Sequence, residues 1–169
     1  MTHRPWAIVV MGVTSTGKTS VGQALARRLG ARFVDGDDLH PAANRAKMAA
    51  GTPLGDADRA PWLARVGRVV GAGGSGRVVA CSALRRTYRT AIQRAAGRPV
   101  TFAFLDGDRA LIAARMAARE GHFMPTSLLD SQFATLERPG PAERAVRVPI
   151  DRPPEAVAVA ALRALGLLS

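Results

Sequence analysis

Short apolar runs, rich in β-branched residues, alternate along this chain with longer stretches in which apolar residues recur every three or four positions. Each short run is apolar at nearly every position, which is typical of strands covered on both faces of a parallel sheet. The alternation therefore predicts an α/β protein built on a parallel sheet. The predicted strands are residues 6–11, 31–35, 77–81, 100–105 and 145–150.

The longer stretches predict helices. In residues 18–29, Val21, Leu25 and Leu29 lie four positions apart, and Gly30 follows as a stop signal. Similar patterns predict helices over residues 84–95, 107–118 and, with prolines in its first turn, 152–166.

A further helix is predicted after residue 125. Ser127 stands three residues before Asp130, which is the spacing of a helix cap, and Pro139-Gly140 is a stop signal. The apolar stripe of this helix is Leu129, Phe133 and Leu136.

Length and composition predict one domain over residues 1–169. No apolar run is long enough to cross a bilayer, and the N-terminal stretch lacks the pattern of a secretory signal. The single cysteine, Cys81, excludes an internal disulfide and a Cys-rich zinc site. We therefore expect a cytoplasmic protein without membrane contacts.

The formal net charge is +11, and all but two of the 24 basic residues are arginine, the exceptions being Lys18 and Lys47. Such a charge suits an anionic ligand or a nucleic acid, but it also suits a surface that is simply solvated by arginine. The arginines are spread along the chain without interleaved aromatic residues, which favours the solvated surface for most of them.

The stretch GVTSTGKT, residues 12–19, fits the pattern G-x-x-x-x-G-K-[ST] and lies between a predicted buried strand and a predicted helix. That context directs backbone N–H groups and the positive end of a helix toward one anion. Lys18 is predicted to neutralise the β- and γ-phosphates, and the Thr19 hydroxyl to ligate Mg²⁺. Switch GTPases and motors share this loop, but the chain lacks an N-K-x-D motif and is short for a motor. A small phosphotransferase fits best.

Acidic residues follow the second predicted strand, at the sheet edge where ligands bind in open α/β folds. Asp35 and Asp37 are two positions apart, so we expect both to leave the strand on the same side. One carboxylate would hold the hydration shell of Mg²⁺, and the other would orient or deprotonate an attacking hydroxyl. The alternative is an Asp-Gly-Asp turn that caps a helix beginning near Pro41.

Other candidate residues have competing structural interpretations. His40 is either a substrate contact or part of a turn. Arg59 could bind an acceptor carboxylate, or it could form an ion pair with Asp56 or Asp58, which its spacing favours. Cys81 is predicted to be a core residue rather than a nucleophile.

Arg115 and Arg119 are four residues apart and share a helix face before a glycine-containing loop. Beside a phosphate loop, such a pair favours a lid that closes over a triphosphate and neutralises transition-state charge. Two solvated arginines near a helix C-terminus are the alternative.

Several long motifs together resemble the gluconokinases, a family of small P-loop kinases. They are GVTSTGKT, DGDDLHPAANRAKMAAGTPLGDADRAPWL, CSALRRTYR and REGHFMPTSLLDSQFATLE. The resemblance implies ATP-dependent phosphorylation of D-gluconate at its 6-hydroxyl. It also implies a three-layer P-loop kinase fold with a five-stranded sheet in the order 2-3-1-4-5, helices on both faces, a mobile lid at about residues 115–126, and a homodimer.

The resemblance assigns roles residue by residue. Lys18, Asp37 and Arg119 are expected to be catalytic, and Thr19 and Asp35 to serve Mg²⁺. The expected nucleotide contacts are Gly12, Val13, Thr14, Ser15, Thr16, Gly17, Lys18, Thr19, Arg115 and Arg119. The expected gluconate contacts are Asp37, His40, Lys47, Arg59, Arg89 and His122.

Three positions depart from the usual family pattern. Ser15 stands where glycine is usual, at a position where a positive φ would be uncomfortable for serine. Arg85 replaces a usual lysine, and Thr90 replaces a frequent aspartate. Two rival functions remain: a kinase of another hydroxy acid such as shikimate, and a non-enzymatic protein that binds nucleotides or nucleic acid.

Overall fold

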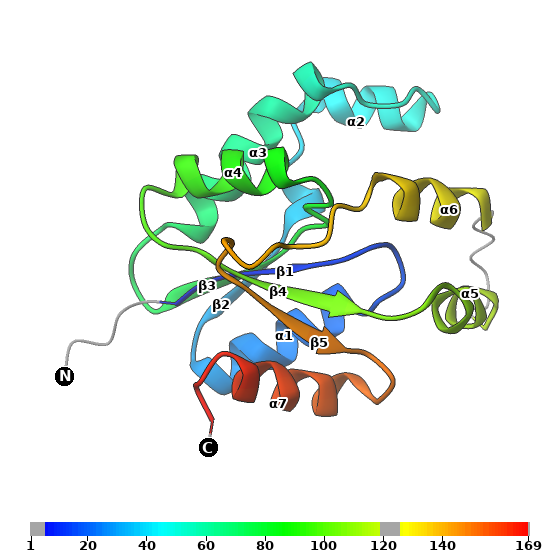
Figure 1. The fold of residues 1–169 in the computed structure, drawn as a ribbon. Helices are drawn as coiled ribbons and strands as arrows, with labels where there is room; N and C mark the ends of the chain where they lie inside the picture. Colours follow the sequence, from blue (N-terminus) through cyan, green and yellow to red (C-terminus); the bar gives the residue numbers. More distant parts are fainter. Residues whose placement is uncertain (1–5, 119–125, 169) are drawn as a thin grey trace.

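Five parallel strands form one sheet in the order β2-β3-β1-β4-β5 in the computed structural model, which describes residues 6–118 and 126–168 (Figure 1). The strands are β1 (Trp6–Met11), β2 (Arg32–Asp35), β3 (Gly76–Ala80), β4 (Thr101–Asp106) and β5 (Ala145–Pro149). Each lies within a residue of its predicted bounds, and the strand order confirms the one that the family resemblance implies.

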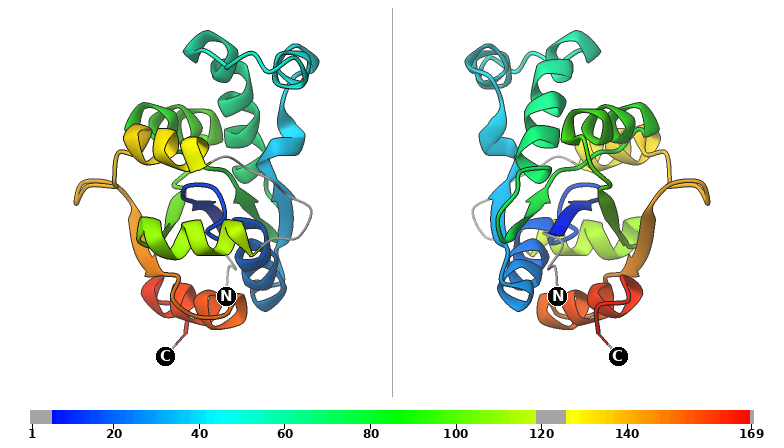
Figure 2. Two further views of the ribbon diagram at one scale, coloured as in Figure 1. Left: turned by 90° about the vertical axis from the view of Figure 1, so that its right-hand side faces the viewer. Right: turned by 90° about the vertical axis from the view of Figure 1, so that its left-hand side faces the viewer.

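Helices cover both faces of the sheet, as the three-layer prediction requires (Figure 2). α1 packs against α7 on one face, and α3 packs against α4 on the other. The helices are α1 (Lys18–Leu29), α2 (Ala42–Ala49), α3 (Asp56–Val70), α4 (Arg86–Ala96), α5 (Arg109–Ala117), α6 (Thr126–Thr135) and α7 (Pro154–Ala164), with the short 3-10 helix η1 (Gly36–Leu39). Among the described residues, no helix is long and apolar enough to cross a membrane.

The period of two along β1 explains why the core has two halves. Ile8 and Val10 belong to the cluster beneath α1 and α7, whereas Val9 and Met11 belong to the cluster beneath α3 and α4. All four are 3% exposed or less. The apolar runs are continuous because alternate residues fill opposite layers, and this double burial fixes β1 as the central strand.

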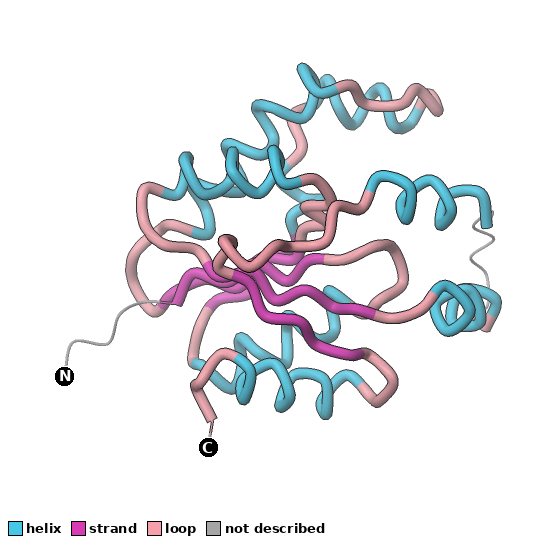
Figure 3. The backbone as a smooth tube through the Cα atoms, viewed as in Figure 1, coloured by secondary structure: helices cyan, strands magenta, loops and turns pink. Residues whose placement is uncertain are grey.

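The carboxyl ends of the strands meet at one edge of the sheet, where the connecting loops gather (Figure 3). β3 lies between β1 and β2, and its Ala80 pairs with Val10 of β1 and with Asp35 of β2. This register places the end of β2 level with the end of β1 and one strand away. Gly36 makes the next turn possible, because a Cβ there would lie 2.4 Å from the Ala80 carbonyl oxygen.

The predicted cap at Ser127 is wrong. α6 begins at Thr126, so Ser127 lies inside its first turn. Asp130 instead pairs with Arg109 of α5, with 2.5 Å between a carboxylate oxygen and Nε. The spacing of a capping box is therefore met here by an ion pair between two helices.

Candidate active site

The loop between β1 and α1 has the backbone of an anion cradle. Gly12, Ser15 and Gly17 have φ values of 149°, 62° and 90°. Gly17 is the N-cap of α1 and offers no side chain to the helix N–H groups, and the first turn of α1 contains no acidic residue. The positive end of the helix therefore faces the loop without an acidic residue in its own first turn to neutralise it.

Lys18 folds back over this loop. Its Nζ donates to the carbonyl oxygens of Gly12 and Val13, at 3.0 and 2.9 Å. Thr16, which is 2% exposed, closes the loop from within by donating from Oγ1 to the Val13 carbonyl at 2.9 Å. The ammonium group is thus held at the centre of the cradle before any phosphate arrives.

Ser15 confirms the expectation that this position needs a positive φ. A non-glycine residue with this backbone is strained. Its Oγ is also the single buried side-chain oxygen or nitrogen without a hydrogen-bond partner in the described part of the chain. An orphaned hydroxyl within an anion cradle is what a phosphate oxygen would satisfy, so the loop fits a nucleoside triphosphate.

We expect Ser15→Gly to raise the free energy of unfolding by about 1 kcal/mol, because glycine relieves the positive φ and removes the unpaired hydroxyl. Ser15→Ala keeps the strain and removes only the hydroxyl, so it separates the two causes. Urea unfolding of the three nucleotide-free proteins measures both effects. A Ser15→Gly protein that is no more stable than the wild type would contradict this account.

A pocket of about 510 Å³ opens beside the loop, between α1, α5 and the segment that joins β5 to α7. Arg115 lines it and donates to the carbonyl oxygen of Ile150, so the end of α5 is tied to that segment. Ser15, Gly17 and Val21 line the same pocket. The pocket therefore continues from the phosphate cradle and has room for the rest of a nucleotide.

Two oxygen donors suit Mg²⁺ at the mouth of the cradle. Thr19 is exposed in the first turn of α1, and Asp35 ends β2. Mg²⁺ prefers hard oxygen ligands and keeps several waters, so it needs few protein groups.

Asp35 and Asp37 were expected to leave one strand on the same side, but only Asp35 belongs to the strand. Asp35 is the last residue of β2, and its Oδ1 accepts from the backbone N–H of Asp37 at 3.0 Å. Asp37 lies in the 3-10 helix η1, because the strand ends where the Asp35 side chain caps this turn. The capping that the sequence suggested is real, but it serves η1 rather than the helix after Pro41.

The Asp37 carboxyl lies in the electrostatic reach of Lys18. Asp37 is an exposed residue, but neighbouring protein atoms remove part of the water around its carboxyl group. This desolvation is the main cause that raises the pKa of Asp37. The negative charge of Asp35 raises the pKa further, whereas the positive charge of Lys18, and that of His40 when its ring is protonated, lower it. A carboxylate with a raised pKa near a phosphate-binding lysine is suited to accept a proton.

His40 is a buried part of the acceptor side. Its ring stacks on Trp62 with 4.2 Å between centroids, and Trp62 Nε1 donates to the Gly36 carbonyl at 2.8 Å. The Asn44 amide nitrogen lies 3.2 Å from His40 Nδ1. Since an amide N–H donates, Nδ1 accepts and the neutral ring carries its proton on Nε2. Burial lowers the pKa of His40, and the charge of Asp37 only partly opposes this.

We expect the free energy of unfolding to fall between pH 6.5 and 5 in the wild type and to fall less in His40→Gln. A histidine with a lowered folded-state pKa binds its proton more readily when unfolded, so acid favours unfolding below the unfolded-state pKa. This window lies above the titration of ordinary carboxylates. Urea unfolding across the window measures the two slopes, and equal slopes would exclude a neutral buried His40.

Three other expected gluconate contacts differ in their surroundings. Lys47 Nζ donates to both carboxylate oxygens of Asp58, each at 2.9 Å, and joins α2 to α3. Arg59 Nη1 donates to the Tyr88 hydroxyl at 3.2 Å and lies 3.7 Å from an Asp56 oxygen. The ion pair that the spacing favoured is thus present, although it is long.

Arg89 is placed where a gluconate ligand is not expected. It is 2% exposed and pairs with Glu143 at 2.6 Å. Its remaining donors reach the carbonyl oxygens of Ala83 and Glu137, both within 2.9 Å. The side chain therefore joins α4 to the segment after α6, and we remove Arg89 from the proposed gluconate ligands.

Arg119 and His122, and most of the expected lid at 115–126, lie outside the described residues.

Cys81 is buried, and burial raises the pKa of its thiol to about 12, which confirms a core residue rather than a nucleophile.

Sequence reasoning missed Tyr88, whose hydroxyl accepts from Arg59, and Gln132. Gln132 Oε1 on α6 accepts from the backbone N–H of Thr14 in the phosphate loop at 2.6 Å. These residues are 118 positions apart, so no local pattern signals the contact. The helix after the expected lid is thereby tied to the phosphate cradle.

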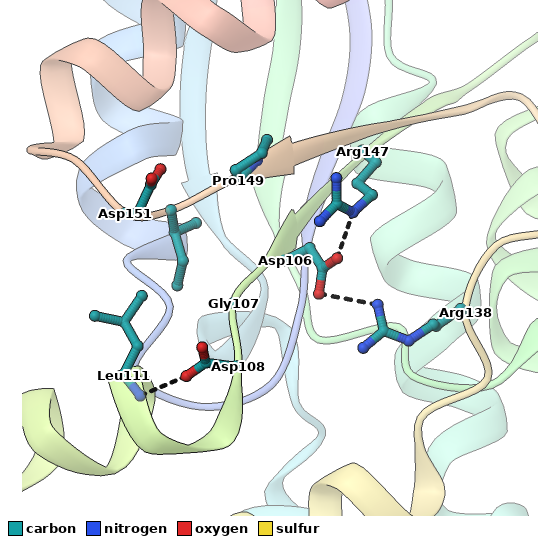
Figure 4. Close-up of a pocket in the computed structure, with 9 residues that line it drawn as sticks. Asp106, Gly107, Asp108, Leu111, Arg138, Arg147, Pro149 and Asp151 are labelled. Atoms are coloured by element: carbon teal, nitrogen blue, oxygen red, sulfur yellow. Dashed lines mark hydrogen bonds and ion pairs between the residues drawn. The ribbon is translucent and has the colours of Figure 1, made fainter.

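A second pocket lies at the ends of β4 and β5 (Figure 4). Asp106, which is 9% exposed, is paired with Arg138 at 2.9 Å and with Arg147. Asp108 accepts from the Leu111 backbone N–H at 2.8 Å and caps α5. Because these charged groups satisfy one another, we assign the cluster to holding the segment after α6 against the sheet.

Comparison with known proteins agrees with this geometry. A family model described as an AAA domain matches residues 8–139. With the strand order, the phosphate cradle and the acidic turn facing it, this match defines a P-loop kinase.

Proteins that are similar to this chain over most of its length show which kind of P-loop kinase it is. The gluconokinase of Gluconobacter oxydans (strain 621H) is 50% identical over 157 residues, which cover 91% of this chain and 88% of that protein. The thermosensitive gluconokinase of Escherichia coli (strain K12) is 46% identical over 151 residues, covering 86% of this chain and 79% of that protein. A crystal structure of a gluconokinase from Sinorhizobium meliloti 1021 matches with a TM-score of 0.86 and 45% identity, covering 96% and 92% of the two chains. The chain belongs to the gluconokinase family.

Proposed function

We propose that this enzyme transfers the γ-phosphoryl group of ATP to the 6-hydroxyl of D-gluconate, giving 6-phospho-D-gluconate and ADP. The observation that carries the proposal is the position of Asp37. Its carboxyl is within electrostatic reach of Lys18, so a hydroxyl near Asp37 faces the end of the phosphate cradle. The family relatives support gluconate as the acceptor.

The residues divide the chemistry between them. Asp37 orients the acceptor hydroxyl and takes its proton as the oxygen bonds to phosphorus and the bond to ADP breaks. Lys18 and the positive end of α1 stabilise the charge on the transferred group. Mg²⁺, held by Thr19 and through water by Asp35, would neutralise phosphate charge when bound.

Two anions must meet in this reaction, so charge neutralisation comes before chemistry. Arg115 lines the pocket beside the cradle and is suited to contact the nucleotide. By the family resemblance we also propose Arg119 and His122 as lid contacts, and Lys47 near the acceptor. Because ATP is the donor, we place the reaction in the cytoplasm.

The rival functions explain less. A shikimate kinase would share the cradle and the acidic turn, but the relatives at 46–50% identity are gluconokinases. A nucleic-acid-binding protein would make use of the net charge of +11. It would leave the acidic turn beside the cradle without a role, since carboxylates repel a phosphodiester backbone.

A coupled assay of ADP release tests the proposal across D-gluconate, shikimate and related hydroxy acids, with Mg²⁺ and ATP. We expect D-gluconate to give by far the highest kcat/KM. Highest activity with another acid, or no activity together with salt-dependent DNA binding, would refute it. Sedimentation of the same sample tests the proposed single-domain homodimer.

A further inference from the structure

A cluster between α3 and α4 joins Arg59, which the family resemblance names as a gluconate contact, to Tyr88 and Arg85, which have no role so far. The Tyr88 hydroxyl donates to Asp56 Oδ1 at 3.1 Å and accepts from Arg59 Nη1 at 3.2 Å. The Arg59 Cζ lies 5.5 Å from the centre of the Tyr88 ring, and the Arg85 Cζ lies 6.0 Å from it. Two guanidinium groups therefore lie near one phenol ring, and cation–π attraction to the ring stabilises them there.

The charge of this cluster is incomplete. The cluster holds two arginines and one carboxylate, Asp56, which is 77% exposed. Asp58, whose charge also acts on Arg59, is already paired with Lys47. The 3.7 Å between Arg59 and Asp56 is too long for a hydrogen bond. Arg85 is exposed and has no carboxylate partner among residues 6–118 and 126–168. One further negative charge would balance the cluster, and guanidinium groups present paired donors that match a carboxylate.

The cluster also lies at a suitable place along the acceptor side. The Asn44 amide nitrogen lies 3.2 Å from His40 Nδ1 and donates to the Asp58 carbonyl oxygen at 2.9 Å, so His40 is joined to the first turn of α3, beside Arg59. The carboxylate of an extended aldonic acid is at the end of the chain opposite its terminal hydroxyl. If that hydroxyl lies at Asp37, the carboxylate lies at the far end of the substrate, and Arg59, next to the residue that Asn44 joins to His40, is a cation suited to receive it.

We propose that Arg59 and Arg85 bind the carboxylate of the sugar acid, and that Tyr88, anchored by Asp56, is the positioning residue that sets the two guanidinium groups. This inference rests on the proposed function, since it assigns the carboxylate of the same substrate. Burial is the main cause that raises the pKa of Tyr88, so the phenol keeps the proton that it donates to Asp56 at neutral pH.

Steady-state kinetics of Arg85→Gln and Tyr88→Phe test the proposal. We expect the KM for D-gluconate to rise roughly tenfold or more in Arg85→Gln and roughly fivefold in Tyr88→Phe, because each loses a contact to a charged group. The kcat and the KM for ATP should change little. Arg86→Gln is the matched control. It removes the same charge one residue further along the chain, from an arginine that has no described contact with the Tyr88 ring.

Arg85→Lys restores the charge without the planar fork and should recover part of the affinity. Calorimetric titration with D-gluconate repeats the comparison without turnover, and thermal unfolding verifies that each variant is folded. Equal effects of Arg85→Gln and Arg86→Gln, an unchanged KM for D-gluconate in Tyr88→Phe, or an equal rise in the KM for ATP would each overturn the assignment. Failure of the wild type to phosphorylate D-gluconate would instead refute the proposed function, and the same variants would then be compared on whichever acid it uses.

Discussion

Lys18→Ala is expected to lose at least about 10³-fold in kcat, because no other side chain of the cradle can neutralise the transferred phosphoryl group. The loss should be chemical rather than structural. The side chain also donates to two loop carbonyls, so the variant should lose about 1 kcal/mol of unfolding free energy and remain folded. Coupled ADP release and thermal unfolding measure the two effects.

Arg28→Ala is the control for Lys18→Ala. It removes a positive side chain from the last turn of the same helix, where Arg28 pairs with Glu155 at 3.3 Å. The pair is exposed, so its loss should leave turnover and stability close to those of the wild type. A Lys18→Ala protein with near-normal turnover would show that the loop does not hold the reacting phosphate.

Asp37→Asn is expected to lower kcat by about 10²- to 10⁴-fold, the usual contribution of a positioned proton acceptor. The amide still accepts a hydrogen bond from the hydroxyl, so the KM for gluconate should change much less than kcat. In the wild type, kcat should fall as the pH drops through a pKa above the ordinary aspartate value of 3.8, since only the ionised carboxyl accepts a proton. The pH profile of the residual activity in Asp37→Asn should lack this acid limb.

Asp38→Asn provides a matched control for Asp37→Asn. Asp38 follows Asp37 in the same turn, is exposed, and its charge contributes to raising the pKa of Asp37. Its removal should leave kcat at neutral pH unchanged and move the acid limb to lower pH. A large loss in Asp38→Asn, or none in Asp37→Asn, would mean that the proton acceptor is misassigned.

The sheet was predictable because its signals are local and repeated. β1 shows its double burial in the run WAIVVM, and α1 shows its period in Val21, Leu25 and Leu29. The phosphate loop was predictable because its pattern of two glycines and a lysine lies between a strand and a helix, whereas the positive φ at Ser15 was indicated only by the glycine usual in the family. The order of the strands came from the family resemblance and not from periodicity.

Other features depend on which distant side chains meet. Asp37 was expected to leave the strand on the same side as Asp35, since sequence spacing does not reveal that the Asp35 carboxylate caps η1 and turns the chain there. Arg89 looked like a ligand because its partner Glu143 is 54 residues away. The contact of Gln132 with Thr14 and that of Arg59 with Tyr88 are likewise set by packing between elements, which no local pattern encodes.

α2 and the first turns of α3 stand apart from the sheet (Figure 1). A hydrogen bond from Trp62 of α3 to the Gly36 carbonyl oxygen of η1 connects this part of the chain to the end of β2. Of the proposed acceptor contacts, Asp37, His40, Lys47 and Arg59 lie in one continuous stretch and Arg85 and Tyr88 lie at the start of α4, whereas the phosphate cradle follows the central strand. Such modularity lets evolution, or an engineer, exchange the acceptor-binding stretch as a cassette and alter acceptor choice without disturbing the donor machinery.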